Sequence, residues 1–206
     1  KLDLVDLPKF SYTKSYLSIV ERKAPETANN FFKKFITKPF SINGHVHKKN
    51  SLKDVQGILK KINPIKLEDN SFYKNWVIDM AKICKIFCHT MKSSVISFSL
   101  ETQRGCRRYH IDNVPFRMLV TYYGQGTEWL PYEAADYEAY HSGAKNKEIV
   151  KDLEARKFIN SWDIAVFRGG TKGILHRTPD QALNRTSILM RLDHSTYLKD
   201  LREYNK

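Results

Sequence analysis

The sequence contains few cysteines and no hydrophobic run long enough to cross a membrane. Three cysteines, Cys84, Cys88 and Cys106, stand among 206 residues. So small and odd a number does not indicate a disulfide framework, and we expect a reducing compartment. A membrane-spanning helix needs roughly 20 apolar residues in succession, and neither such a run nor a signal peptide is visible. We therefore expect a cytoplasmic protein without a membrane span.

Acidic residues are also scarce relative to basic ones. Lysine and arginine number 35 against 22 aspartates and glutamates, which gives a net charge of +13. Such a charge permits nucleic acid, an acidic protein or a membrane surface as partner. The lysines are scattered from Lys9 to Lys206, which favours a solvated surface over a nucleic-acid-binding face. No repeat, low-complexity tract or domain boundary is visible, so we expect a single domain over residues 1–206.

Residues 1–92 are expected to form a mainly helical support. Apolar residues recur at helical spacing in 24–35, 51–61 and 69–91, and each stretch predicts an amphipathic helix. Cys84 and Cys88 share a helix face, where core packing is favoured over zinc. His45 and His47 alternate as in a strand, and surface or core packing is favoured over a metal site there too.

From Ser93 onward apolar residues alternate with polar ones. Gly, Pro and Asn residues separate these alternating segments, which predicts short strands. This pattern indicates an α+β protein with a mainly β core, a jelly roll of two packed antiparallel sheets over 93–195. An insertion at 132–158, with a helix from Asn146 to Phe158, would sit over the mouth of the barrel as a lid. The expected strands are 95–100, 107–112, 116–123, 127–130, 163–167, 173–176 and 185–193.

One imidazole and one carboxylate are expected side by side at His110 and Asp112. Alternate residues of a strand share a face, and His176 is the best third ligand. Two histidines and one carboxylate can hold a divalent ion while leaving positions open. Arg185 and Ser187 would likewise share a strand face and bind a carboxylate by a guanidinium and a hydroxyl. Arg191 is a rival for Arg185, because it falls on the same face.

The order H-x-D, His, R-x-S resembles that of the iron(II)/2-oxoglutarate-dependent dioxygenases, and Gly126–Pro131 resembles a segment of their prolyl-hydroxylase-like members. CRRYHIDNV and YGQGTEWLP resemble more closely an uncharacterised bacterial family with C-R-R-F-H-x-D-N-V and G-P-G-T-E-W-L-P, over roughly residues 95–195. That family supplies no established reaction. Its distant resemblance to the dioxygenases implies a cupin-like double-stranded β-helix, with Fe(II) and 2-oxoglutarate as cofactors.

The dioxygenase resemblance also implies roles for individual residues. His110, Asp112 and His176 would be the catalytic metal ligands, and Arg185 with Ser187 would bind 2-oxoglutarate. The row Arg117, Thr121 and Tyr123 lies on the strand where a hydroxyl often assists the cosubstrate, although an exposed polar row is an equally simple interpretation. Glu128 and Trp129 would shape the pocket rim.

Other interpretations stay open from the residues alone. Zinc could occupy the same ligands, and Cys106, if it joined them, would favour a closed tetrahedral site. The leading alternative function is a non-catalytic, zinc-binding jelly roll that handles metal, and a third is a basic binding module. The substrate, a small molecule or a protein, is not specified.

Overall fold

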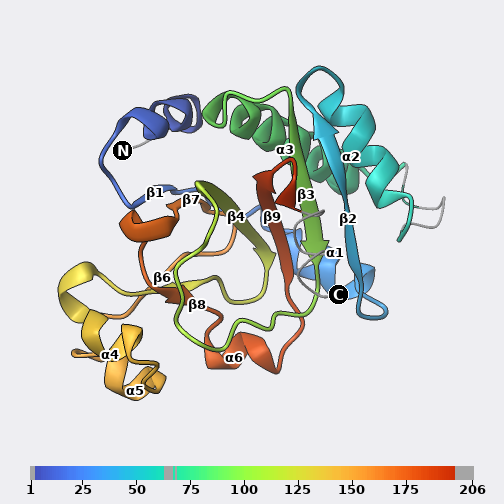
Figure 1. The fold of residues 1–206 in the computed structure, drawn as a ribbon. Helices are drawn as coiled ribbons and strands as arrows, with labels where there is room; N and C mark the ends of the chain where they lie inside the picture. The colour runs from blue at the N-terminus through green and yellow to red at the C-terminus, as the bar shows by residue number, and fades with distance from the viewer. Residues whose placement is uncertain (1–2, 63–66, 68, 198–206) are drawn as a thin grey trace, which may run out of the picture.

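The computed structural model describes residues 3–62, 67 and 69–197, and its core is a largely antiparallel β structure packed with helices (Figure 1). Six described strands form the major sheet, and all of its pairings are antiparallel. Their order across the sheet is β1 (Leu17–Val20), β7 (Ile164–Arg168), β4 (Phe116–Tyr123), β9 (Ile188–His194), β3 (Val95–Glu101) and β2 (Ser41–His47). A minor sheet consists of β6 (Lys157–Phe158), β5 (Glu128–Trp129) and β8 (His176–Arg177).

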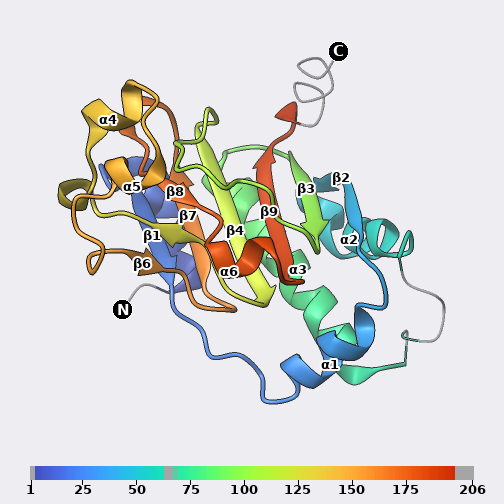
Figure 2. The same ribbon diagram turned by 90° about the horizontal axis from the view of Figure 1, so that it is seen from below.

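Helices cover one face of the major sheet (Figures 1 and 2). The helices on this side are η1 (Leu4–Tyr12), α1 (Ala28–Phe35), η2 (Lys48–Asn50), α2 (Ser51–Leu59) and α3 (Ser71–Thr90). The apolar stripe of α3, including Trp76, Met80 and Phe87, packs in one core with the even-numbered residues of β4 and β9. Burial of such a stripe is what holds a helix on a sheet. The three predicted α-helices are confirmed, with slightly shorter bounds.

The opposite face of the major sheet packs toward the minor sheet. A small core of Leu119, Ile159, Ala165, Phe167 and Ile174 lies there, with Trp129 and Leu189 against it. Because strand side chains alternate faces, the odd-numbered residues of β9, and those of β4 up to Thr121, point to this side. The region between the sheets is therefore the place where groups from both sheets meet.

The N-terminal part is not only a helical support, since β1 and β2 pair with β7 and β3 in the major sheet. The helix prediction there overlooked short strands, although the alternation at His45–His47 falls within β2. Two other predictions are wrong in detail. Residues 107–112 contain only an isolated bridge at His110, and β9 begins three residues later than expected. The jelly-roll topology stays a prediction.

The insertion at 132–158 packs against the outer face of the minor sheet. It contains η4 (Tyr132–Ala134), α4 (Tyr137–His141) and α5 (Asn146–Ile149), and the expected helix from Asn146 to Phe158 ends at Ile149. Tyr137 and Ile149 pack with Leu130 and Leu175, which alternation places on the side opposite Trp129 and His176. The insertion thus covers the outer face of the minor sheet (Figure 2), and its role as a lid stays a prediction.

The remaining helices of the described chain are η5 (Gly170–Lys172) and α6 (Asp180–Leu183), which flank β8. Among the described residues, none of the helices combines the length and the apolarity that crossing a bilayer requires.

Candidate metal centre

A short antiparallel bridge places the imidazoles of His110 and His176 next to each other. The amide of His110 donates to the carbonyl of His176 at 3.0 Å, and the amide of His176 donates back at 3.1 Å. The ring centroids are 4.5 Å apart, and Phe167 packs on His176 at the same distance. Directly paired strand residues point to the same face, so both rings face the region between the sheets.

Asp112 completes a group of three, whose nearest ligand atoms all lie within 4.8 Å of one another. Its backbone is held by the loop that follows β7, where the amide of Gly170 donates to the Asp112 carbonyl at 2.7 Å. A Cβ on Gly169 would lie 2.0 Å from the carbonyl oxygen of Val114 and 2.3 Å from that of Asp112. Only glycine allows this approach, and the same loop leads through Gly173 into His176.

We expect Gly169→Ala to weaken metal binding strongly, although the substitution adds only one methyl group. The added methyl group must push the loop away from Asp112, which displaces the carboxylate from the imidazoles. Metal affinity should fall by about tenfold or more, within the range seen when support around a metal ligand is lost. Isothermal titration with manganese would measure this. Gly143→Ala is a control for glycine replacement, since its added Cβ would contact nothing within 4 Å although its φ is +84°. Equal affinities for the Gly169 variant and the parent would contradict the expectation.

Hydrogen bonding fixes which ring nitrogen carries the proton when each histidine is neutral. His110 Nδ1 lies 3.0 Å from the carbonyl oxygen of Arg108, and His176 Nδ1 lies 3.0 Å from that of Ile174. A carbonyl oxygen only accepts, so each Nδ1 carries the proton. The Nε2 atom of each neutral ring then presents a lone pair, the arrangement that metal-binding histidines adopt.

The carboxylate of Asp112 faces these lone pairs with an oxygen that lacks a hydrogen bond. Asp112 is only 4% exposed, and its Oδ2 has no hydrogen-bond partner in the described chain. Oδ2 lies 3.4 Å from His176 Nε2, and Oδ1 lies 3.8 Å from His110 Nε2. Burial alone raises the pKa of Asp112, but His176, Arg117 and His110 outweigh it and hold the pKa well below its usual range. An ionised oxygen and two ring nitrogens therefore converge, and when both rings are neutral all three are electron-pair donors that a cation between them would satisfy.

Arg117 leaves one carboxylate oxygen of Asp112 available. Its Nη1 donates to Asp112 Oδ1, and its Nε donates to Asp193 Oδ1 at 2.8 Å. The second oxygen of Asp193 lies 3.3 Å from Nε of Arg191. Through these ion pairs, the candidate ligand Asp112 is connected to β9. The sequence does not predict this network, because residues 112, 117 and 193 have no local pattern in common.

The predicted row on β4 is only partly formed. Arg117 and Thr121 are buried and share the face toward the minor sheet. A register shift between Thr121 and Tyr123 breaks the alternation, and Tyr123 packs near Phe32 on the helical side. Tyr123 therefore does not continue the row, and Arg117 serves first as the partner of two carboxylates.

Arg185 and Ser187 lie away from the His–Asp–His group. The prediction that they share a face of a strand is wrong, because β9 begins at Ile188 and Arg185 is exposed. Arg185 lines a hollow with Tyr123, whereas Asp112 is bound to Arg117, six positions earlier in β4. At about 3.3 Å per residue these ends of the strand are roughly 20 Å apart.

Arg191, the rival, lies on the face toward the minor sheet and is closer to the centre. It pairs directly with Ser99 of β3, and its guanidinium is 5.2 Å from the ring of Tyr197, while that of Arg117 is 5.0 Å from the same ring. Neither Arg191 Nε nor Ser99 Oγ has a hydrogen bond in the described chain. A guanidinium and a hydroxyl thus occur together here.

Glu128 does not shape a pocket rim. It is buried, accepts a hydrogen bond from the hydroxyl of Tyr109, and lies 3.0 Å from Arg177 Nη2. Because Glu128 is directly opposite Arg177 and Trp129 is opposite His176, the ion pair lies on the outer face of the minor sheet. Trp129 faces the small core between the sheets, with an indole N–H that has no partner in the described residues.

The remaining candidate ligands lie outside the group. Cys106 is exposed, and among the described residues the candidate group consists of His110, Asp112 and His176. Cys84 and Cys88 belong to the main core, as the sequence favoured. His45 Nε2 contacts the carbonyl of Ser195 at 2.8 Å, and His47 Nδ1 contacts Asp54 at 2.9 Å. These two imidazoles therefore have separate partners.

Comparison with known proteins places the chain in a family without assigning a reaction. No curated protein matches it. A solved structure described as "Selenomethionine labeled Fe(II)/(alpha)ketoglutarate-dependent dioxygenase TqaL" is weakly similar, with a TM-score of 0.44 and 11% identity over 92% of this chain and 86% of that chain. A family model matches residues 3–193, and the chain therefore belongs to the family described as "Protein of unknown function (DUF1826)".

Proposed function

We propose that the protein is a non-haem iron(II)- and 2-oxoglutarate-dependent oxygenase. The observation that carries this proposal is the convergence of two Nε2 lone pairs and the unpartnered Oδ2 of a buried, ionised aspartate. With both rings neutral, such a set places three electron-pair donors against one another, and a cation would satisfy them. Two histidines and one carboxylate with open positions are the ligand set typical of non-haem iron(II) oxygenases.

The chain's own residues would hold the metal from one side. His176 and Asp112 are almost fully buried, whereas the side chain of His110 is 30% exposed, so the group is reachable from the His110 side. Bound iron(II) would supply the activation of dioxygen, coupled to oxidative decarboxylation of 2-oxoglutarate. The carbonyls that accept from each Nδ1 would keep both rings oriented, and Arg117 would keep Asp112 ionised and in place.

Arg191 is better placed than Arg185 to bind the far carboxylate of 2-oxoglutarate. Its contacts with Glu101 and Asp193 are long, at 3.6 and 3.3 Å, and its Nε remains without a hydrogen bond. The Ser99 hydroxyl beside it is likewise free to donate. A planar guanidinium with an adjacent hydroxyl suits a carboxylate.

The jelly-roll topology belongs to the same proposal. Two antiparallel sheets face each other across a small core, and the candidate ligands lie at that interface. In a double-stranded β-helix, side chains from both sheets enclose one site, which suits ligands drawn from residues 110–112 and 176. The substrate, a small molecule or a protein, is left unassigned.

Anaerobic metal analysis followed by titration with 2-oxoglutarate tests the function. We expect one iron(II) per chain and a charge-transfer absorption band that appears only with both iron and 2-oxoglutarate. Tight zinc binding without any response to 2-oxoglutarate would favour the metal-handling alternative instead. Protein that binds no divalent ion would contradict both and leave the basic binding module.

Arg191→Met should separate cosubstrate binding from metal binding. We expect it to weaken 2-oxoglutarate at least tenfold, because a charge-assisted hydrogen bond of about 1.5–3 kcal/mol is lost, while iron affinity changes little. Arg185→Met is the matched variant and should leave 2-oxoglutarate binding unchanged. Titration of the charge-transfer band measures both. If Arg185→Met weakens 2-oxoglutarate binding and Arg191→Met does not, Arg185 is the residue that binds the carboxylate.

A further inference from the structure

A polar hollow lies beyond the ends of β4 and β9, at the opposite end of these strands from His110, Asp112 and His176. Its volume is about 680 Å³. A second hollow of about 430 Å³ shares Arg185 and Thr186 with it and adds Arg104. We call the first the Arg185 hollow. Its lining includes Lys33, Tyr123, Gln125, Arg185 and Ser187.

The charges around the Arg185 hollow are all of one sign. Lys33 and Arg185 line it, and no aspartate or glutamate does. Within the described part of the chain neither cation has an ion-pair partner. An arginine in a concave site without a carboxylate is suited to a ligand oxyanion, which its guanidinium can bind by two parallel hydrogen bonds.

Two buried polar atoms on the wall of the hollow also lack partners. Ser187 is 0% exposed, and its Oγ has no hydrogen bond among the described residues. The same holds for Oε1 of Gln125. Buried polar atoms are rarely left unpaired, because each costs roughly 1–3 kcal/mol. A hydroxyl that donates and an amide oxygen that accepts would both be satisfied by a ligand that carries an oxyanion and a hydroxyl.

We propose that the Arg185 hollow binds a small hydroxylated oxyanion, a sugar phosphate or a hydroxy acid, at a site separate from the metal centre. Arg185 and Lys33 would neutralise the oxyanion, Ser187 would donate to it, and Gln125 would accept from a ligand hydroxyl. The guanidinium and hydroxyl at Arg185 and Ser187 thus keep the carboxylate-binding chemistry indicated by the sequence, in a different place.

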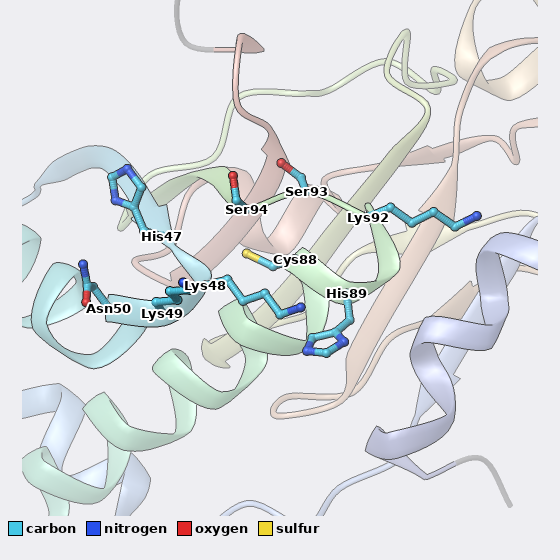
Figure 3. A pocket seen from close by; sticks show the side chains of 9 residues that line it. All are labelled: His47, Lys48, Lys49, Asn50, Cys88, His89, Lys92, Ser93 and Ser94. Atoms are coloured by element: carbon cyan, nitrogen blue, oxygen red, sulfur yellow. The ribbon is translucent and has the colours of Figure 1, made fainter.

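A larger hollow, of about 780 Å³, is also basic but has fewer signs of a built site (Figure 3). It is lined by Lys48, Lys49 and Lys92, and Figure 3 shows the side chain of Lys92 pointing away from that of Lys48. Lys92 instead lies over the ring of Tyr12 at 4.5 Å. His47 in its wall is paired with Asp54. This hollow serves as the internal comparison.

Amide chemical-shift titrations of the metal-free protein with glycerol 3-phosphate, glycerate and glycerol test the proposal. We expect saturable shifts at Gly124, Thr186 and Ser187 with one or both oxyanions and none with glycerol, and the stronger of the two identifies phosphate or carboxylate as the preferred group. Arg185→Met should weaken binding about tenfold or more. Ser187→Ala should weaken it without lowering the melting temperature, whereas Lys49→Met should leave it unchanged.

Shifts that map instead to His89 and Lys92, or binding unaffected by Arg185→Met, would overturn the proposal. So would the absence of saturable shifts with both oxyanions. Because the protein in this titration holds no metal, the result does not depend on whether the oxygenase proposal succeeds.

Discussion

Replacement of His176 by alanine is expected to abolish stoichiometric metal binding while leaving the fold intact. The variant removes one of three converging donors, and a divalent ion would keep only His110 and Asp112. Loss of an outer-shell group already costs about 10–100-fold in affinity, so loss of a direct ligand should cost at least 100-fold. His176 lies on β8, a strand of two residues, away from the main helical core.

Thermal unfolding with and without manganese measures this effect. A metal at 100 times its Kd stabilises the parent by about 2.7 kcal/mol, which corresponds to roughly 5–11 °C for a domain of this size. The variant should show no metal-dependent rise. His141→Ala is the control, because His141 is an exposed imidazole on α4, and it should keep the full rise. A metal-dependent rise that survives in His176→Ala would rule out His176 as a ligand.

Arg117→Met should be the most destabilising single substitution among the charged residues of the centre. It removes the shared partner of Asp112 and Asp193, both buried. Burial raises the pKa of Asp193, and Arg117 is the main group that opposes this shift. Breaking a buried ion pair by removing one member costs about 3–5 kcal/mol, so we expect the melting temperature to fall by roughly 6–20 °C.

A second substitution distinguishes charge from packing in that result. Adding Asp193→Asn to Arg117→Met removes one of the stranded carboxylates and should restore part of the lost stability, a coupling that a double-mutant cycle measures. Arg107→Met changes an exposed arginine and should alter stability by no more than about 0.5 kcal/mol. If Arg117→Met unfolds at the parent temperature, the charge chain described here does not hold Asp112.

The sequence predicted that His110, Asp112 and His176 would converge, but the expected cause, strand alternation, is only partly correct. Strand alternation was expected to align His110 with Asp112, yet residues 107–112 contain a single bridge to His176. The aspartate is brought into place by Arg117 and by the loop at Gly169 and Gly170. Local spacing predicted that these side chains would lie together, and contacts from distant parts of the chain position them.

Arg185 and Arg191 show where such local reasoning fails. Both satisfy the same alternation in sequence, so the choice between them depends on where β9 begins. That point is set by pairing with β4, whose register shifts between Thr121 and Tyr123. A shift of this kind has no signature in either strand alone.

Strand β1 was missed, and β2 was recognised only at His45–His47, for a similar reason. β1 has four residues, and β2 contains Gly44 in its middle, which weakens any strand pattern. The structure gives this glycine a role, since a Cβ there would lie 2.8 Å from the side chain of Ile58. The close packing of α2 on β2 is a tertiary requirement that hydrophobic periodicity does not contain.

The most direct test of the metal centre is an anomalous-scattering crystal structure of protein loaded with iron(II) or manganese(II) without oxygen. We predict one strong peak about 2.0–2.3 Å, the usual reach of nitrogen and oxygen ligands, from Nε2 of His110, Nε2 of His176 and Oδ2 of Asp112. A peak at another group of residues, or none at full metal loading, would contradict the proposed site and with it the oxygenase function.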